Sequence, residues 1–217
     1  MAKPVHIKIC GLKTRDDIAA AAEAGARWIG LVHFEKSPRH VSLEDGRVLV
    51  DAAADIAPSL ETVVLLVNPT PEEAVEVADA LGVDHIQLHG SEGNDVLAAI
   101  RKLRPVGEVW KALPVSERSD LEAVKDYPAA DRFLFDAKPP TDASRPGGLG
   151  HSFDWSVLEG FACDRPWLLA GGLTPENVTE AVRVTKAPGV DVSSGVEAEK
   201  GVKSAEKIKA FCQAVRG

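Results

Sequence analysis

Residues 5–25 read VHIKICGLKTRDDIAAAAEAG, and this stretch contains the unit that decides the fold. A short apolar run comes first and predicts a strand, and a segment of helical periodicity follows it. Thr14 and Asp17 have the spacing of a capping box, and Gly25 stands where the helix is expected to stop. The stretch therefore predicts one strand followed by one helix.

The same unit recurs along the whole chain. Runs rich in Val, Ile and Leu begin near positions 5, 28, 62, 84, 107, 132, 166 and 189, and a helical segment is expected after each. Two further helix starts are marked by Thr70-Pro71 and Thr174-Pro175, where a capping residue precedes a first-turn proline. Eight such units in 217 residues predict an α/β fold, a single (β/α)8 TIM barrel that forms one domain over residues 1–217.

Composition and charge limit the kinds of partner. The chain is 45% hydrophobic, and its longest apolar runs are far shorter than the roughly 18 residues that a membrane span needs. The net charge is −8 and no cluster of Lys and Arg is present, so neither nucleic acid nor a membrane is expected as a partner. Three widely separated cysteines fit neither a disulfide framework nor a metal site. The N-terminus shows no signal peptide, and a cytoplasmic location is expected.

Two of the units are about ten residues longer than the others. The surplus lies after the second strand, at residues 35–40, and after the sixth strand, at residues 138–150. Both segments are expected at the C-terminal ends of the barrel strands, where such barrels place their chemistry. Arg39 in the first of these loops has a planar fork that suits a carboxylate. The alternative for Arg39 is a solvated surface position.

The first strand holds a candidate base. Alternation places Lys8 and Cys10 on one face, and Ile7 and Ile9 on the other. The aliphatic pair is expected to face the helices, which puts Lys8 inside the barrel and Cys10 at its rim. A lysine in that position can stabilise a thiolate. The alternative is a buried core cysteine without a chemical role.

The sixth strand ends in Asp136, directly before the long loop, and Phe133 and Phe135 are expected to pack outward. Asp136 is a candidate general acid if desolvation raises its pKa, and the alternative is an aspartate that caps the turn. Gln87 and His89 close the fourth strand on one face and are expected to supply hydrogen bonds, unless His89 is purely structural. No spacing of two histidines and a carboxylate indicates a metal.

Glycine and serine follow the seventh and eighth strands directly. At these two places they predict a phosphate cradle of backbone N–H groups, although either loop alone is more often a tight turn. The expected phosphate-binding residues are Gly171, Gly172, Ser193, Ser194 and Gly195. The glycine run at residues 147–150 lacks the Lys-Ser/Thr of a P-loop, so a nucleotide is not expected there.

Five of these segments resemble the phosphoribosylanthranilate isomerase family of tryptophan biosynthesis. They are Lys8-Ile9-Cys10-Gly11, Lys36-Ser37-Pro38-Arg39, Gln87-Leu88-His89-Gly90, residues 169–173 and residues 191–197. Leu149 departs from the family, which more often has threonine there. The resemblance implies an isomerase that acts without a cofactor or metal on a small phosphosugar. Its reaction is the Amadori rearrangement of N-(5-phosphoribosyl)anthranilate to 1-(2-carboxyphenylamino)-1-deoxy-D-ribulose 5-phosphate.

The resemblance also implies the roles of individual residues. Asp136 would protonate the furanose ring oxygen and Cys10 would remove the C2 proton. The substrate would be bound by Arg39, which takes the anthranilate carboxylate, and by Gln87, His89, Lys8 and Asp191. The five glycine and serine residues named above would hold the phosphate.

Two alternatives remain open at this point. One is another phosphosugar aldose–ketose isomerase on the same barrel, which would have a carboxylate where Cys10 stands. The other is a non-catalytic barrel that binds a phosphate ligand and needs neither Cys10 nor Asp136. The sequence indicates no particular oligomeric state.

Overall fold

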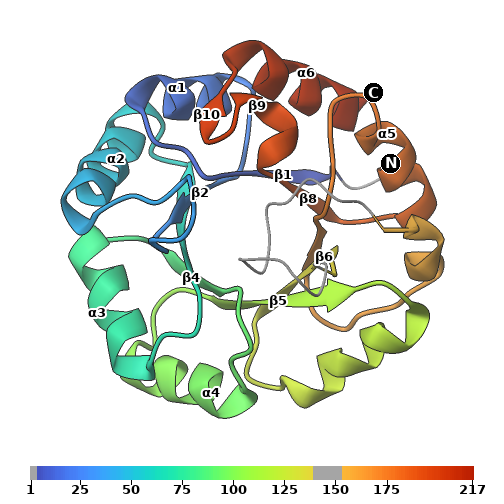
Figure 1. Cartoon of the computed structure of the whole chain (residues 1–217), viewed down its shortest axis with the longest axis horizontal. Coiled ribbons are helices and arrows are strands. Elements are labelled where there is room, and N and C mark those ends of the chain that lie inside the picture. The colour runs from blue at the N-terminus through green and yellow to red at the C-terminus, as the bar shows by residue number, and fades with distance from the viewer. Residues whose placement is uncertain (1–3, 139–152) are drawn as a thin grey trace.

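The computed structural model describes residues 4–138 and 153–217. Eight parallel strands each pair with the next, and the last pairs with the first, so that they close a barrel (Figure 1). They are β1 (His6–Cys10), β2 (Trp28–Val32), β3 (Glu61–Leu66), β4 (His85–Leu88), β5 (Val109–Val115), β6 (Arg132–Ala137), β7 (Trp167–Leu169) and β8 (Gly189–Val192). The predicted barrel is confirmed, and every strand begins within two residues of its expected position.

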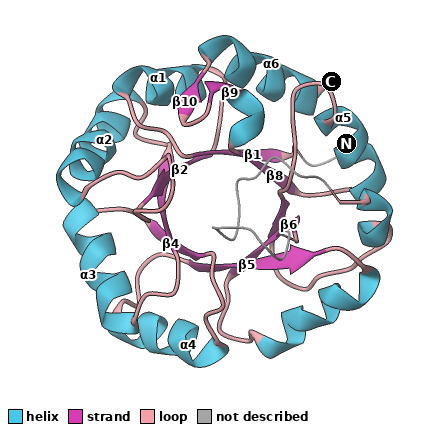
Figure 2. Cartoon of the chain, viewed as in Figure 1, coloured by secondary structure: helices cyan, strands magenta, loops and turns pink. Residues whose placement is uncertain are grey.

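Helices form the outer layer around this barrel (Figure 2). They are α1 (Arg15–Glu23), α2 (Leu43–Ile56), α3 (Pro71–Leu81), α4 (Asn94–Leu103), α5 (Val178–Thr185) and α6 (Ala205–Arg216). Thr14 and Thr70 form capping boxes at the starts of α1 and α3, and Gly82 ends α3 in a left-handed conformation with φ of 73°. Within the described ranges no helix is long and apolar enough to cross a membrane.

Three connections differ from the expected strand and helix alternation. After β5 the chain forms the 3-10 helix η1 (Arg118–Asp126), and the described residues between β6 and β7 contain the short 3-10 helix η2 (Trp155–Leu158). At η1, Asp120 accepts hydrogen bonds from the N–H groups of Ser116 and Glu117 as the N3 residue of a capping box, which marks the start of this helix. After β8 come η3 (Ser194–Val196) and a hairpin of β9 (Glu197–Glu199) and β10 (Val202–Lys203), which the sequence had not indicated.

The apolar residues occupy two separate layers. Ile7, Ile9, Phe133 and Phe135 lie in the core between strands and helices, which confirms the expected facing of β1 and β6. The barrel interior is filled by a smaller cluster of buried residues: Trp28, Val63, Trp110, Ala112, Leu134 and Leu168. Lys8 is completely buried inside the barrel, as alternation predicts.

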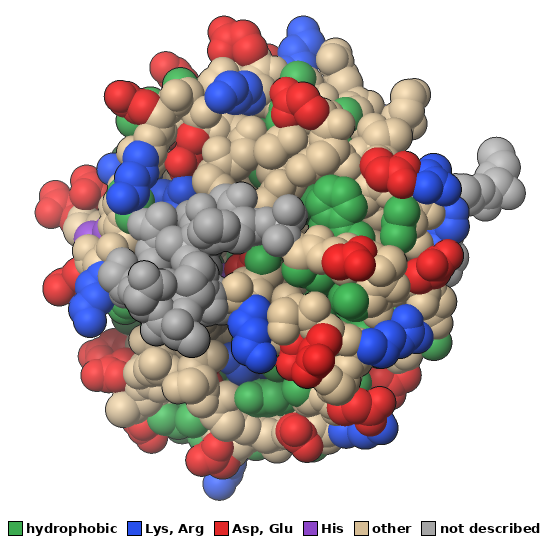
Figure 3. Space-filling model, turned by 45° about the vertical axis from the view of Figure 1, so that its right-hand side comes forward, with side chains coloured by type: hydrophobic (Ala, Val, Ile, Leu, Met, Phe, Trp, Pro, Cys, Tyr) green, Lys and Arg blue, Asp and Glu red, His purple; other side chains and the backbone are tan. Residues whose placement is uncertain are grey.

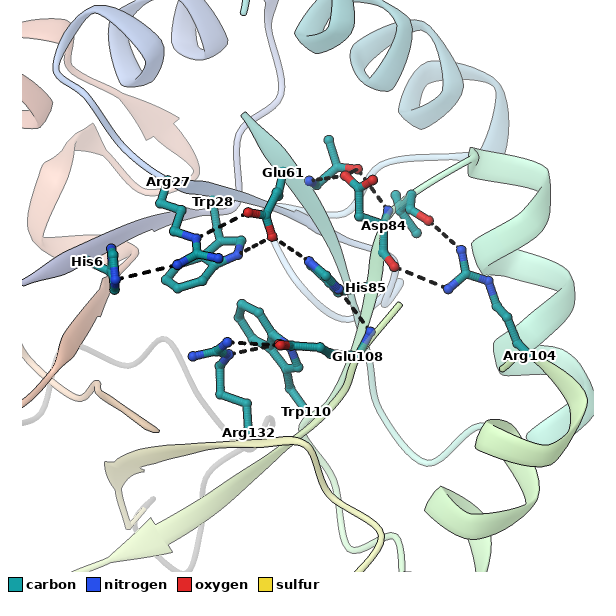
Figure 4. A network of polar contacts seen from close by, with 12 residues as sticks. His6, Arg27, Trp28, Glu61, Asp84, His85, Arg104, Glu108, Trp110 and Arg132 are labelled. Atoms are coloured by element: carbon teal, nitrogen blue, oxygen red, sulfur yellow. Dashed lines mark hydrogen bonds and ion pairs between the residues drawn. The ribbon is translucent and has the colours of Figure 1, made fainter. Parts of the chain in front are cut away.

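The N-terminal end of the barrel is closed by a polar and aromatic network (Figure 4). The guanidinium carbon of Arg132 lies 4.8 Å from the ring centroid of Trp28 and 5.0 Å from that of Trp110. Its Nε and Nη2 donate to the two carboxylate oxygens of Glu108 at 3.0 and 3.1 Å. These residues stand at the first or second positions of their strands or, for Glu108, just before the strand, so the network lies at the end of the barrel opposite Cys10.

We expect Arg132→Ala to destabilise the barrel without lowering activity. The change removes two cation–π contacts and leaves the half-buried Glu108 without its cation, which should cost about 1–2 kcal/mol after allowance for solvent screening. Urea unfolding measures the loss. Lys125→Ala is the matched control, because Lys125 and its partner Glu122 are both largely exposed and should contribute nothing measurable. An Arg132→Ala protein of unchanged stability would contradict the role assigned to the network.

The same variant should alter the dependence of stability on pH. Burial tends to raise the pKa of Glu108, but the hydrogen bonds and charge of Arg132 outweigh it and hold the pKa below its ordinary value. The resulting stabilisation is present above the pKa of an unfolded glutamate, about 4.3, and is lost as the pH falls through the folded-state pKa. The difference in unfolding free energy between wild type and Arg132→Ala should therefore shrink in acid. Urea unfolding at neutral pH and near pH ~3.5 tests this.

Candidate active site

The candidate residues gather at the C-terminal end of the barrel. Cys10 is the last residue of β1, Asp136 is the second-last residue of β6, and His89 directly follows β4. The glycine and serine loops come directly after β7 and β8, which lie between β6 and β1 in the barrel. Because all strands are parallel, these groups meet at one mouth, with Cys10 and Asp136 on either side of the two loops.

Cys10 lies in a buried polar cluster. Its exposed fraction is 3%, and the neighbouring Lys8 forms an ion pair with Asp191 of β8, with 2.8 Å between Nζ and Oδ1. A Cβ added at Gly30 would lie 2.7 Å from Sγ of Cys10 and 3.0 Å from Nζ of Lys8. Sγ of Cys10 and Nζ of Lys8 therefore both border the space that a side chain at position 30 would fill. The structure brings together Lys8, Cys10 and Asp191, three of the predicted site residues.

The charges of this cluster act on Cys10 in opposite directions. Burial raises the pKa of the Cys10 thiol, the cations Lys8 and Lys203 oppose this, and Asp191 adds to it, so the pKa lies above its ordinary value. Burial tends to lower the pKa of Lys8, but Asp191 and Cys10 outweigh it and keep the ammonium protonated. Cys10 thus holds its proton at rest beside a cation that stabilises the thiolate once the proton leaves.

Asp136 ends a row of three polar side chains. Nε2 of His89 lies 3.1 Å from Oδ2 of Asp136, and Nδ1 of His89 lies 3.0 Å from the amide nitrogen of Gln87. An amide nitrogen only donates, so Nδ1 accepts and Nε2 carries the proton that it donates to Asp136. The other carboxylate oxygen accepts from the N–H of Ala137 at 2.8 Å. Asp136 is therefore held by two donors at the mouth, in contact with a second group that can exchange a proton.

Gln87 leaves one polar atom unused. Its side chain is fully buried, and within the described residues its Oε1 has no hydrogen-bond partner. A buried acceptor without a partner costs free energy, so an O–H or N–H group of a ligand at this position would be stabilising. This suits the predicted role of Gln87 in substrate binding.

The two glycine loops depend on the absence of side chains. Gly171 and Gly172 have φ of 83° and 64°, and a Cβ on Gly171 would lie 2.5 Å from the nitrogen of Ala137. A Cβ on Gly195 would lie 1.9 Å from the carbonyl oxygen of Leu173, so the loops after β7 and β8 pack directly on each other. In the described part of the chain, the turn and loop hydrogen bonds use none of the N–H groups of Gly171, Gly172, Ser194 and Gly195 as donors. These groups are available to bind an anion.

Arg39 is not a solvated surface residue. It is 3% exposed, and its Nε and Nη2 donate to the two carboxylate oxygens of Glu197 at 2.6 and 3.0 Å. Its stem lies against Gly11, where a Cβ would come within 2.5 Å of Cδ. The structure therefore gives the guanidinium a carboxylate partner from its own chain. Binding of a substrate carboxylate by Arg39 stays a prediction.

Sequence reasoning missed four buried charged residues at this end. Glu197 pairs with Lys203 as well as Arg39, and Nζ of Lys203 also donates to the carbonyl of Ser193 at 2.9 Å. Lys111 and Glu92 form a buried pair at 2.9 Å, and Lys111 donates to the carbonyl of Gly90, which fixes the loop that follows His89. The only sequence signal was Gly201 between Glu197 and Lys203, as in a hairpin turn.

Part of the predicted site lies outside the described residues. Leu149, the glycine run at residues 147–150 and nearly all of the long loop after β6 belong to residues 139–152. Over the two described ranges, no group of three or more His, Cys, Asp or Glu side chains is arranged to hold a metal ion.

Comparison with known proteins identifies a family. The family model described as N-(5'phosphoribosyl)anthranilate (PRA) isomerase matches residues 7–214. The N-(5'-phosphoribosyl)anthranilate isomerase of Rhodopseudomonas palustris strain HaA2 is 48% identical over 213 residues, which cover 98% of this chain and 96% of that protein. The enzyme of the same name from Erythrobacter litoralis is 49% identical over 211 residues, 97% of this chain and 98% of that protein.

Solved structures agree with this result. The phosphoribosyl anthranilate isomerase of Thermotoga maritima superposes with a TM-score of 0.86 at 36% identity, covering 98% of this chain and 99% of that one. A phosphoribosyl anthranilate isomerase in complex with reduced 1-(o-carboxyphenylamino)-1-deoxyribulose 5-phosphate has a TM-score of 0.83 at 34% identity, with the same coverage.

We expect Gly30→Ala to disturb the cluster around Cys10 selectively. The new methyl group would displace Sγ of Cys10 or Nζ of Lys8, so the thiolate would lose part of its cationic neighbour and form at higher pH. Alkylation of Cys10 as a function of pH, with the modified residue identified by mass spectrometry, measures this.

Gly46→Ala is the control for an added methyl group in a packed position, because it would meet the side chains of Leu81 and Val41 and not the cluster around Cys10. An alkylation profile for Gly30→Ala that coincides with those of the wild type and the control would contradict the proximity of Cys10 and Lys8.

Proposed function

The chain belongs to the N-(5'-phosphoribosyl)anthranilate isomerase family, and on this basis we propose that Cys10 and Asp136 are the base and the acid of its reaction. The enzyme interconverts an aldose and a ketose in tryptophan biosynthesis, by the Amadori rearrangement of N-(5-phosphoribosyl)anthranilate. The supporting observation is the position of both residues at one barrel mouth, on opposite sides of the two glycine loops. Neither a different phosphosugar isomerase nor a non-catalytic barrel is favoured by the relatives.

Asp136 supplies the first proton. It protonates the furanose ring oxygen, the bond from this oxygen to C1 breaks, and the lone pair of the anthranilate nitrogen forms a C1=N iminium. The carboxylate that remains on Asp136 is stabilised by the N–H of Ala137 and by the His89 ring. His89 therefore supports proton transfer by Asp136 in addition to lining the substrate site.

Cys10 acts on the iminium. Its thiolate takes the proton from C2, the C2–H electron pair forms the C1=C2 bond, and the electrons of the iminium return to nitrogen. The resulting enolamine becomes the ketone when C1 gains a proton and the C2 hydroxyl loses one to solvent. Return of the proton from Cys10 to Asp136 through solvent completes the cycle. Proximity to the Lys8 ammonium stabilises the thiolate that this step needs.

The substrate is held at both ends. The N–H groups of the two glycine loops, at Gly171, Gly172, Ser193, Ser194 and Gly195, bind the phosphate, because backbone dipoles hold an anion without a charged side chain. Arg39 binds the anthranilate carboxylate, and Glu197 fixes the orientation of its guanidinium. Gln87, Lys8 and Asp191 line the space between these ends. Restraining both ends aligns the sugar between acid and base.

The reaction needs no cofactor, because proton transfers by one acid and one base account for every bond change. The partner of the site is the phosphosugar itself, in keeping with a homologous isomerase solved in complex with a reduced 1-deoxyribulose 5-phosphate compound. We place the enzyme in the cytoplasm, as one domain over residues 1–217. The free thiols of Cys10, Cys163 and Cys212 fit a reducing compartment.

We expect Cys10→Ser to retain the fold and substrate binding but to lose kcat by about a hundredfold or more, because a serine alkoxide does not form near neutral pH. Loss of anthranilate fluorescence during turnover of phosphoribosylanthranilate measures kcat. Wild-type turnover by the serine variant would show that Cys10 is not the base. Failure of the folded wild-type enzyme to convert this substrate would contradict the function as a whole.

Asp136→Asn should abolish ring opening while binding persists, since the amide keeps the shape of the side chain but cannot donate the proton. We expect kcat to fall by about a hundredfold or more, with an unchanged Kd for a reduced product analogue measured by calorimetry. The exposed Asp95→Asn serves as the control for the loss of one negative charge. A near-normal kcat for Asp136→Asn would remove Asp136 from the mechanism.

A further inference from the structure

Lys203 is a buried cation next to Cys10 that the reaction described above does not use. It belongs to the hairpin β9–β10, which lies beside β1 between α1 and α6 (Figure 1). Its side chain is 0% exposed, and Nζ donates to the carbonyl of Ser193 at 2.9 Å and to Oε1 of Glu197 at 3.0 Å. The Ser193 hydroxyl in turn donates to the carbonyl of Cys10 at 3.0 Å. One residue therefore separates Lys203 from the backbone of Cys10.

The charges around Cys10 do not cancel. The groups that face it are Lys8 from β1, Asp191 from β8 and Lys203 from β10, while β2 contributes the uncharged Gly30. Lys8 and Asp191 form an ion pair and act in opposite directions on the thiol of Cys10. Lys203 is a second cation, and it acts on the thiol of Cys10 in the same direction as Lys8.

The carboxylate partner of Lys203 is shared with a second cation. Glu197 accepts a hydrogen bond from Lys203 and also accepts the bidentate hydrogen bonds of Arg39. All three side chains are at most 5% exposed. Lys203 therefore keeps only a share of this carboxylate, and a second anion nearby, such as the thiolate of Cys10, would stabilise its buried ammonium.

We propose that Lys203 stabilises the thiolate of Cys10 and thereby sets the pH range in which Cys10 acts as the base. Lys203 is a positioning residue: it acts on the proton of Cys10 and does not contact the substrate. The inference rests on the proposed role of Cys10. The two groups act on each other with the expected signs. Burial and the charge of Arg39 hold the pKa of Lys203 below its ordinary value, Glu197 and Cys10 act in the opposite direction, and Lys203 in turn lowers the pKa of Cys10. Lys8 cannot do this alone, because Asp191 opposes its effect on the same thiol.

A purely structural role for Lys203 makes a different prediction. If Lys203 only held the loop at Ser193, its loss would lower stability or raise KM through the phosphate site. It would not change the pH at which the Cys10 thiolate forms. The position of that titration therefore separates the two roles.

The test uses Lys203→Met in an enzyme that also carries Cys163→Ala and Cys212→Ala, so that Cys10 is the only thiol. Ultraviolet absorbance of the thiolate gives the titration of Cys10, and kcat/KM is measured over the same pH range. The active form is the deprotonated thiol, so activity rises with pH through this titration. We expect both curves to move to higher pH by about one unit, with a roughly tenfold loss of kcat/KM at neutral pH.

Two further variants complete this experiment. Lys203→Arg keeps the charge and should restore both curves to near their wild-type positions. Lys200→Met removes an exposed cation from the turn of the same hairpin and should leave both unchanged. An absorbance titration of Lys203→Met that coincides with that of its parent would overturn the proposal.

Glu197→Gln gives a test of opposite sign that does not depend on folding of the methionine variant. It removes a carboxylate but keeps the shape of the side chain, so the cations around Cys10 are less neutralised and the thiolate should form at lower pH. A shift to higher pH, or none, would contradict the inference. If the absorbance titrations shift as expected while kcat/KM does not follow, Lys203 tunes the thiol but Cys10 is not the base, and the proposed function fails instead.

Discussion

The ion pair between Lys8 and Asp191 joins the first strand of the barrel to the last. The two residues are direct partners in the register of β1 and β8, the pairing that closes the barrel. Their side chains point inward, where neither charge would be tolerated without the other. The seam of the barrel thus places a protonated lysine next to Cys10 at the C-terminal end of β1. Closure of the fold and the electrostatics of the thiol depend on the same contact.

The two ends of the barrel use buried charge differently. At the N-terminal end, Arg132 is sandwiched by two tryptophans and fully paired with Glu108, so its charge has no group left to act on. At the C-terminal end, the cations Lys8 and Lys203 adjoin a thiol that can become an anion. The first arrangement stabilises the barrel, and the second can respond to a proton. This division agrees with the separation of stability and chemistry between the two ends of such barrels.

The barrel was predictable because the alternation of strand and helix is local in sequence. The positions of Cys10 and Asp136 were predictable for the same reason, since each ends a recognisable strand. The 3-10 form of η1 was missed because a capping box, here of Glu117 and Asp120, marks where a helix starts but not its hydrogen-bond pattern. Pairing of Arg39 with Glu197 was beyond reach, because 158 residues separate them and only the closed barrel brings them together. The roles of buried charges therefore had to come from the structure.

The placement of cations also explains how a protein with a negative net charge can bind an anionic substrate. Charged side chains of both signs are interspersed on the face shown in Figure 3, and the net charge is −8, so the outer surface does not attract an anion in general. Lys8, Arg39, Lys111 and Lys203 are instead buried at or near the mouth. The substrate of the family carries a phosphate and a carboxylate, and the proposed mechanism forms a thiolate between them. Burial concentrates positive potential where these anions meet, because the low dielectric strengthens each interaction there. The same burial would destabilise these cations if they had no anionic partners. Asp191, Glu92 and Glu197 form ion pairs with them, so the carboxylates at the mouth make a cationic site possible in this fold.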